Sequence, residues 1–149
     1  MKLDMSKVYD RVEWKFLEEI TRRMGFCETW IKWIMSCVSS VNYSFNINGD
    51  LKGYVTPARG IRQGDPLSPY LFLLCSEGFT YLLRKAKRDK RITGMKICRQ
   101  GPSITHLFFF ADDTLIFSKA DTKEAEELRQ ILKMYEKSSG TCHNKHRRE

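Results

Sequence analysis

The sequence has 149 residues, in which 26 lysines and arginines oppose 18 aspartates and glutamates, giving a formal net charge of +8. This length suffices for one domain with a hydrophobic core, and an apolar content of 42% is ordinary for a globular protein. Because there is no run of about eighteen apolar residues and no apolar leader, we expect no membrane span and an intracellular protein, in either the nucleus or the cytoplasm.

Hydrophobic spacing predicts helices and a hairpin in the first part of the chain. In the helical stretches apolar residues recur every three or four positions, whereas in the strands they alternate with polar ones. Asn48-Gly49 is typical of a two-residue hairpin turn. The predicted elements are a strand at residues 1–5, helices from Asp10 to about Met24 and from about Glu28 to Ser39, a strand at residues 42–47 and a return strand from about Leu51 to Val55.

The second part begins with a loop rich in glycine and proline, "TPARGIRQGDPLSP". Ser68 and Pro69 then predict a helix with serine as N-cap, and Asp121 with Glu124 predicts a last helix that starts with a capping box. Mixed helices and strands with tight turns favour an α+β domain, an antiparallel sheet backed by helices. The predicted elements are a helix from Ser68, strands at Met95–Cys98, Ile104–Phe110 and Thr114–Phe117, and a helix to about Lys137 that ends at Gly140.

Two adjacent carboxylates interrupt an apolar stretch in "HLFFFADDTLIF". Asp112 and Asp113 repel each other at a predicted hairpin tip, and a divalent cation such as Mg²⁺ would remove the conflict. Asp4, at the end of the first strand, supplies a third carboxylate if that strand lies beside the hairpin. Together the three could hold two metal ions about 3.5–4 Å apart. The alternatives are an exposed turn for the pair and a helix N-cap for Asp4.

The loop before Ser68 has the composition of a ligand-binding connection. Gly60 and Gly64 allow the backbone to approach a ligand closely, and Gln63 offers both a donor and an acceptor. Its position ahead of a helix start makes contact with a phosphate or nucleotide plausible. The alternative is an ordinary connection between elements.

Charge and cysteine content indicate the partner and the compartment. A basic chain favours a polyanionic partner such as nucleic acid. Its basic residues gather near the end of the predicted helix that starts at Ser68, where they either contact phosphates or simply form a solvated helix end. Five cysteines without a C-x-x-C pair favour ordinary buried thiols in a reducing compartment. The gathered basic residues are Arg84, Lys85, Lys87, Arg88, Lys90 and Arg91.

Three segments, in this order, resemble core blocks of a reverse transcriptase: "KLDMSKVYDRVEW", "RGIRQGDPLSPYLFLLC" and "FADDTLIF". The sequence is most similar to the LINE-type group, retrotransposons without long terminal repeats, and particularly to plant elements. A later segment, "SSGTCHN", resembles a further block of the same family. The resemblance covers nearly the whole chain and fades after Asn144.

The resemblance implies a polymerase palm that spans residues 1–149, with the fingers and thumb outside this chain. It implies that Asp4, Asp112 and Asp113 bind two Mg²⁺ ions and catalyse nucleotidyl transfer from a dNTP to a DNA primer on an RNA template. Tyr9 would pack under the incoming sugar, while Gln63 and Gly64 would flank the nucleotide and template. Without fingers, we expect the isolated chain not to extend primers.

Two other functions remain open at this point. The first is a catalytically dead retrotransposon relic that binds nucleic acid nonspecifically. The second is a metal phosphohydrolase, which would also use clustered aspartates but would give no role to Tyr9 or to Gln63 and Gly64. The sequence also departs from the family in having three phenylalanines, 108–110, where two are usual. A β-bulge there would keep both ends of the strand in register.

Overall fold

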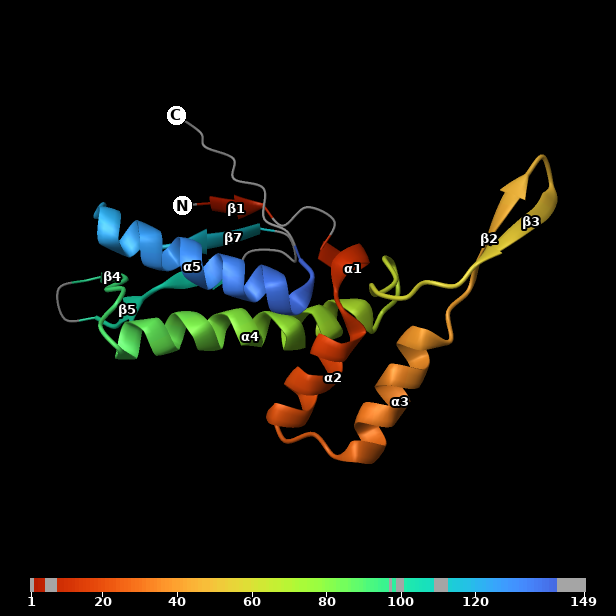
Figure 1. The fold of residues 1–149 in the computed structure, drawn as a ribbon, viewed down its shortest axis with the longest axis horizontal. Helices are drawn as coiled ribbons and strands as arrows, with labels where there is room; N and C mark the ends of the chain where they lie inside the picture. The colour runs from red at the N-terminus through yellow and green to blue at the C-terminus, as the bar shows by residue number, and fades with distance from the viewer. Residues whose placement is uncertain (1, 5–7, 97, 99–100, 109–112, 142–149) are drawn as a thin grey trace.

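The structure, a computed structural model, describes residues 2–4, 8–96, 98, 101–108 and 113–141, with the backbone alone at residues 2–4, 8, 107, 108 and 113. Helices and strands are mixed along the chain (Figure 1), which confirms the α+β prediction. The helices are α1 (Val8–Arg11), α2 (Trp14–Arg23), α3 (Glu28–Ser39), α4 (Ser68–Arg88) and α5 (Thr122–Ser139). The strands are β1 (Lys2–Asp4), β2 (Tyr43–Ile47), β3 (Asp50–Val55), β4 (Met95–Lys96), β5 (Ser103–Ile104), β6 (His106–Phe108) and β7 (Asp113–Ile116).

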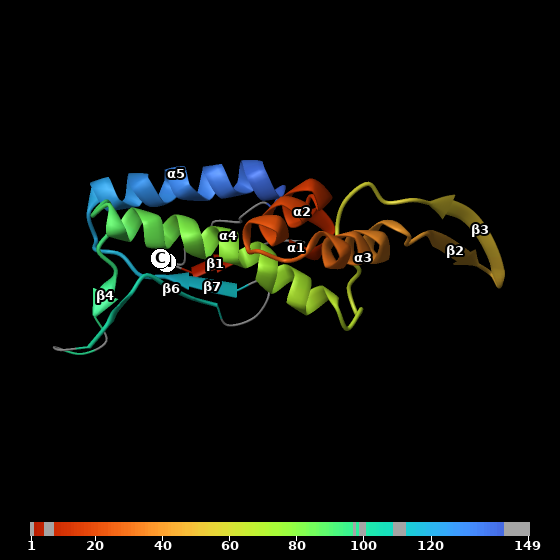
Figure 2. The ribbon, with the colours of Figure 1, turned by 90° about the horizontal axis from the view of Figure 1, so that it is seen from below.

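The first and last thirds of the chain meet in a three-stranded antiparallel sheet of order β1-β7-β6. The two long helices α4 and α5 lie on the same side of this sheet (Figure 2). Thr114 and Ile116 of β7 are fully buried, which places alternate positions of this strand against the helices. The opposite side of the sheet is not covered by either long helix.

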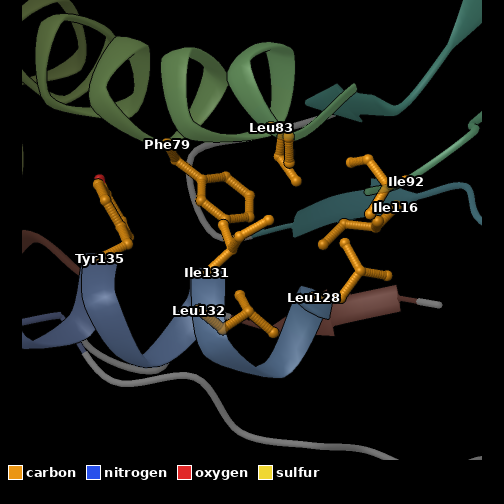
Figure 3. Close-up of a cluster of buried hydrophobic side chains, with 9 residues drawn as sticks. Phe79, Leu83, Ile92, Ile116, Leu128, Ile131, Leu132 and Tyr135 are labelled. Atoms are coloured by element: carbon orange, nitrogen blue, oxygen red, sulfur yellow. The ribbon is translucent and has the colours of Figure 1, made fainter. Parts of the chain in front are cut away.

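The main hydrophobic core fills the space between α4, α5 and β7 (Figure 3). Phe79 packs against Tyr135 with ring centroids 5.2 Å apart, and the Tyr135 hydroxyl donates a 3.2 Å hydrogen bond to the Cys75 carbonyl. Burial raises the pKa of the Cys75 thiol to about 12, so this cysteine is a structural thiol. The buried members of the core are Phe79, Leu83, Ala86, Ile92, Ile116, Leu128, Ile131, Leu132 and Tyr135.

The predicted helix from Asp10 to Met24 is wrong in one respect, because it breaks into α1 and α2 at Val12 and Glu13. The Val12 carbonyl accepts a 2.8 Å hydrogen bond from the Gly60 N–H, and the Glu13 N–H donates to the Ser139 carbonyl at 3.0 Å. The Val12 carbonyl and the Glu13 N–H are thus hydrogen-bonded to distant segments of the chain, and not to backbone groups one helical turn away. A pattern of apolar spacing contains no information on such long-range bonds.

The predicted α3 and the hairpin of β2 and β3 are confirmed, α3 with the predicted bounds. Asn48 and Gly49 have φ values of +53° and +93°, the left-handed conformation that a type I′ turn requires at both positions. A register shift between Ser44 and Phe45 coincides with Gly53, whose φ is +70°. Figure 1 shows this hairpin projecting from the rest of the chain.

The helix starts differ in detail from their prediction. Ser68 is the first residue of α4 and Leu67 is its N-cap, so the prediction of Ser68 as N-cap is wrong by one residue. The Asp65 side chain caps this turn instead, accepting from the Leu67 N–H at 2.8 Å. At α5, Asp121 is the N-cap as predicted, and Gly140 ends the helix with φ +74°. Glu124 reaches back to the Lys119 N–H at 3.1 Å.

The predicted strand Ile104–Phe110 is divided at Thr105, where β5 pairs with β4 and β6 with β7. The β6–β7 register is regular from His106 to Phe108. The predicted bulge at residues 108–110 is not tested further, because Phe109 and Phe110 lie outside the described residues. The expectation of buried thiols holds for Cys75 but is wrong for three other described cysteines, which are exposed: Cys27, Cys37 and Cys98. No helix in the described ranges combines the length and apolar character that crossing a membrane needs.

Candidate catalytic site

Two of the three predicted carboxylate residues meet in the β1–β7 pair. Asp4 lies directly opposite Asp113, and the pairing continues through Leu3 with Thr114. Asp112 lies outside the described residues. The adjacency of the first strand and the acidic hairpin, which the sequence could only suggest, is thus present in the fold.

Two aspartates at paired positions are a residue type that suits a divalent cation. Residues directly opposite in an antiparallel pair have Cβ atoms about 4.5–5.5 Å apart, and like charges there are destabilising. Mg²⁺ commonly binds one or two carboxylates plus substrate phosphates, which matches a pair of aspartates on neighbouring strands. Among the described side chains, no group of three or more histidines, cysteines and carboxylates is arranged to hold a metal ion.

The glycine-rich loop is held against the segment that follows Asp4. The Ile61 N–H donates a 2.7 Å hydrogen bond to the Tyr9 carbonyl, and Ile61 is buried. The indole Nε1 of Trp14 donates to the Gly60 carbonyl at 2.7 Å. Gly60 has φ +89°, and a Cβ there would lie 2.9 Å from the Asp10 carbonyl oxygen. Only glycine fits this close approach of two backbones.

Gln63 and Gly64 form the tip of this loop and are exposed. The Asp65 N–H donates to the Arg62 carbonyl at 3.4 Å, which closes a turn with Gln63 and Gly64 at its centre. Gly64 has φ +83°, as the third position of a type II turn requires, and the space around its Cα is open. The loop therefore presents the two predicted nucleotide-flanking residues to solvent on an anchored base.

Tyr9 is partly buried in a second hydrophobic cluster beneath this loop. Its ring lies 5.6 Å, centroid to centroid, from that of Phe72 on α4, at an angle of 41°. A contact with the hydrophobic cluster and a contact with a sugar are compatible for a ring that is only partly buried. The cluster consists of Val12, Leu17, Ile34, Ile61, Leu71, Phe72 and Cys75.

The predicted basic cluster occupies the last turns of α4 and continues past its end at Arg88 to Lys90 and Arg91, and its members differ in their surroundings. Arg84, Lys85 and Arg88 are exposed. Lys87 is partly buried and donates through Nζ to the Ser103 carbonyl at 2.5 Å, so this residue ties α4 to β5. Arg88 lies 3.8 Å from Asp89, a surface pair of little energetic weight.

Sequence reasoning missed two contacts that position these residues. One is the hydrogen bond from the Trp14 indole to the Gly60 carbonyl, which no local sequence pattern predicts. The other is His106, whose Nε2 lies 3.1 Å from the Thr80 hydroxyl of α4. A histidine in the apolar run before the aspartates is a signal that could have singled it out.

Comparison with known proteins gives a consistent result. A family model described as reverse transcriptase (RNA-dependent DNA polymerase) matches residues 1–147. An uncharacterized mitochondrial protein of Arabidopsis thaliana is 54% identical over 70 residues, which are 47% of this chain and 57% of that protein. The Pol polyprotein of the retrotransposable element R2DM of Drosophila melanogaster is 32% identical over 117 residues, 78% of this chain and 10% of that protein.

A 149 kDa protein of the transposon TX1 of Xenopus laevis is 29% identical over 133 residues, 88% of this chain and 10% of that protein. The chain thus spans only part of the length of these relatives, about a tenth in the two transposon proteins. The resemblance to LINE-type elements that the motifs indicated is confirmed by these matches. The chain belongs to the reverse transcriptase (RNA-dependent DNA polymerase) family.

Proposed function

We propose that this chain is the palm of an RNA-directed DNA polymerase, which adds a deoxynucleotide to a DNA primer on an RNA template. The observation that carries the proposal is the direct pairing of Asp4 with Asp113 in the β1–β7 pair. Two acidic residues at such a position destabilise a sheet unless a cation offsets their repulsion. A pair of this kind on the strands of a reverse transcriptase family chain is best explained by metal binding.

In this proposal Asp4, Asp112 and Asp113 hold two Mg²⁺ ions. The ions, when bound, would stabilise the attacking primer oxygen and the leaving pyrophosphate oxygen during attack on the α-phosphorus. Strand alternation assigns position 113 to the side of the sheet opposite the buried Thr114, away from α4 and α5. In this proposal a template–primer duplex would approach the aspartates from that side.

The incoming dNTP would lie between Tyr9 and the Gln63-Gly64 turn. The hydrogen bond from the Ile61 N–H to the Tyr9 carbonyl joins the two segments that carry these residues. The exposed amide of Gln63 can donate to or accept from a base or sugar, and the open space at Gly64 admits a ligand close to the backbone. Tyr9 would exclude a 2′-hydroxyl by its bulk.

Nucleic acid binding is supported by the net charge of +8 and by the exposed Arg84, Lys85 and Arg88. Contacts to phosphates supply most of the sequence-independent affinity of such proteins. Lys87 belongs to the same end of α4 and adds its positive charge there. Its Nζ also donates a hydrogen bond to the Ser103 carbonyl.

The test uses a chimaera in which this chain replaces the aligned segment of the Drosophila R2DM polyprotein. We expect extension of a DNA primer on an RNA template that depends on Mg²⁺ and on dNTPs, and its loss by several orders of magnitude in Asp113→Asn. Glu77→Gln, which removes an exposed carboxylate of α4, is the matched control and should leave extension unchanged. An Asp113→Asn chimaera that extends primers normally would contradict the proposal.

The alternative of a dead relic that binds nucleic acid has its own signature. A relic would bind RNA or DNA with a steep dependence on salt, while the wild-type chimaera would fail to extend primers under any divalent metal. Extension by the wild-type chimaera therefore separates the two functions. We expect the isolated 149-residue chain to bind but not to extend, because groups outside it must orient the triphosphate.

A further inference from the structure

His106 connects the three-stranded sheet to α4 through a directed hydrogen bond. The half-buried ring lies between two buried threonine hydroxyls, with Nε2 3.1 Å from Thr80 Oγ1 and Nδ1 3.0 Å from Thr105 Oγ1. A neutral imidazole donates from one nitrogen and accepts at the other. One threonine hydroxyl therefore accepts and the other donates, whichever tautomer is present.

The surroundings of the ring favour its neutral form. Burial lowers the pKa of His106 from its ordinary value, and the positive charge of Arg84 on α4 lowers it further. On its other side the ring meets Phe79 edge to face, with centroids 6.4 Å apart, and its cross-strand partner is the apolar Ile116. A neutral, directional ring is what a fixed hydrogen-bonded contact between two elements needs.

The contact links the register of the sheet to a fixed point on α4. His106 is opposite Ile116, and the same regular register continues to Phe108 opposite Thr114, the residue after Asp113. Asp113 in turn pairs with Asp4. A shift of His106 along α4 would therefore move both aspartate positions with it.

The same helix also defines the position of the nucleotide-flanking turn. α4 begins at Ser68, just after the turn of Gln63 and Gly64, and Thr80 lies about 18 Å further along the helix axis at 1.5 Å per residue. A continuous α-helix is stiff over this length. Fixing the sheet at Thr80 thus fixes the distance between the aspartates and the turn.

We propose that His106 is a positioning residue that, through Thr80, holds the aspartate-bearing strands in register with the Gln63-Gly64 turn. The proposal rests on the proposed function, in which those aspartates and that turn act on the same nucleotide. His106 itself does not touch substrate: it belongs to the helix-facing positions of β6, together with the buried Ile116 of β7.

Two matched pairs of variants test this proposal. Glutamine places a polar atom where Nε2 lies and asparagine places one where Nδ1 lies, so His106→Gln should keep the contact with Thr80 and His106→Asn should abolish it. Thr80→Val removes the hydroxyl at nearly constant volume, and Thr80→Ser restores it. All four variants are made in the 149-residue chain.

The first readout is nuclear magnetic resonance of the wild-type and variant chains. We expect the ring nitrogens of His106 to show a single fixed tautomer at pH 7, and the Asp113 and Asp4 amide signals to shift in His106→Asn and Thr80→Val. The same amide signals should stay in place in His106→Gln and Thr80→Ser. Unshifted aspartate amides in a folded Thr80→Val chain would overturn the proposal.

The second readout is Mn²⁺ affinity, measured with the metal alone. We expect roughly a tenfold loss in His106→Asn and Thr80→Val, the size seen when groups that orient metal ligands are removed, and retention in their partners. Equal affinity in all four variants would count against a positioning role. If the wild-type chain does not bind Mn²⁺, the proposed function fails, and the amide and ring signals still decide the role of His106.

Discussion

Asp4 and Asp113 lie directly opposite each other in the antiparallel pair of β1 and β7, although one stands at the start of the chain and the other in its last third. Like charges at directly opposite positions are destabilising by roughly 0.2–1 kcal/mol. If a cation binds between the two aspartates, it offsets their repulsion and stabilises the folded chain, and removal of the cation reverses this gain. Stability is therefore a direct measure of whether the pair binds metal.

The first prediction concerns this repulsion. In buffer without divalent cations, Asp4→Asn should raise the free energy of unfolding by roughly 0.5–1 kcal/mol, because one of the opposed charges is gone. Mg²⁺ at ten times its dissociation constant should stabilise the wild-type chain by about 1.4 kcal/mol and the variant far less. Thermal unfolding with and without Mg²⁺ measures both, with Glu77→Gln as control. A variant that Mg²⁺ stabilises as strongly as wild type would contradict the metal site.

The second prediction compares two glycines of the same loop. Gly60→Ala should destabilise the chain strongly, because its Cβ would lie 2.9 Å from the Asp10 carbonyl oxygen and its φ is +89°. Gly64 also has a positive φ, +83°, but an added Cβ would meet open space. Gly64→Ala should therefore lower the free energy of unfolding only by the conformational strain, about 1–2 kcal/mol. Denaturant unfolding gives both values. Equal losses for the two variants would mean that the loop is not anchored as described.

The third prediction concerns Tyr9. In the R2DM chimaera, Tyr9→Ala should raise incorporation of ribonucleotides relative to deoxynucleotides, because the ring would no longer exclude the 2′-hydroxyl. Tyr9→Phe keeps the ring and should leave the ratio unchanged. Both variants should also be compared in unfolding, since the ring contacts Phe72. An unchanged ratio of ribonucleotide to deoxynucleotide incorporation in Tyr9→Ala would show that Tyr9 has only a structural role.

The fourth prediction concerns pH. Because the pKa of His106 is lowered in the folded chain from its ordinary value of 6.5, the unfolded chain binds a proton that the folded chain does not. The free energy of unfolding should therefore fall as the pH drops below about 6.5, with the slope ending at the lower folded pKa. His106→Gln should flatten this dependence between pH 6.5 and the acidic limit where carboxylates titrate. A slope that persists in His106→Gln would show that another group is responsible.

The fifth prediction concerns nucleic acid. Replacing Arg84 and Arg88 together by alanine should reduce the slope of log affinity against log salt by about 0.9 for each phosphate of duplex DNA that the two arginines neutralise. The control is Arg23→Ala, an exposed arginine of α2 that pairs with Glu19 at 2.8 Å. Binding is measured by fluorescence anisotropy across salt concentrations. An unaltered slope in the double variant would show that Arg84 and Arg88 do not bind phosphates.

Local chemistry alone determined much of the secondary structure. α3 has the predicted bounds, β2 lies within the predicted alternating stretch, and Asn48-Gly49 forms the predicted turn, because hydrophobic period and left-handed turn residues act over a few positions. Gly140 ends α5 for the same kind of reason, with φ +74°. The three sequence blocks likewise predicted the family that the comparisons confirm.

Only the tertiary structure decided how these pieces meet. The break at Val12 and Glu13 arises because Gly60 and Ser139 take the backbone groups that a helix would have used. The pairing of Asp4 with Asp113 arises from hydrogen bonds between strands that no local pattern specifies. Local propensity fixes which dihedral angles a segment prefers, whereas strand partners and loop contacts depend on which distant groups remain to satisfy the backbone and to bury the core.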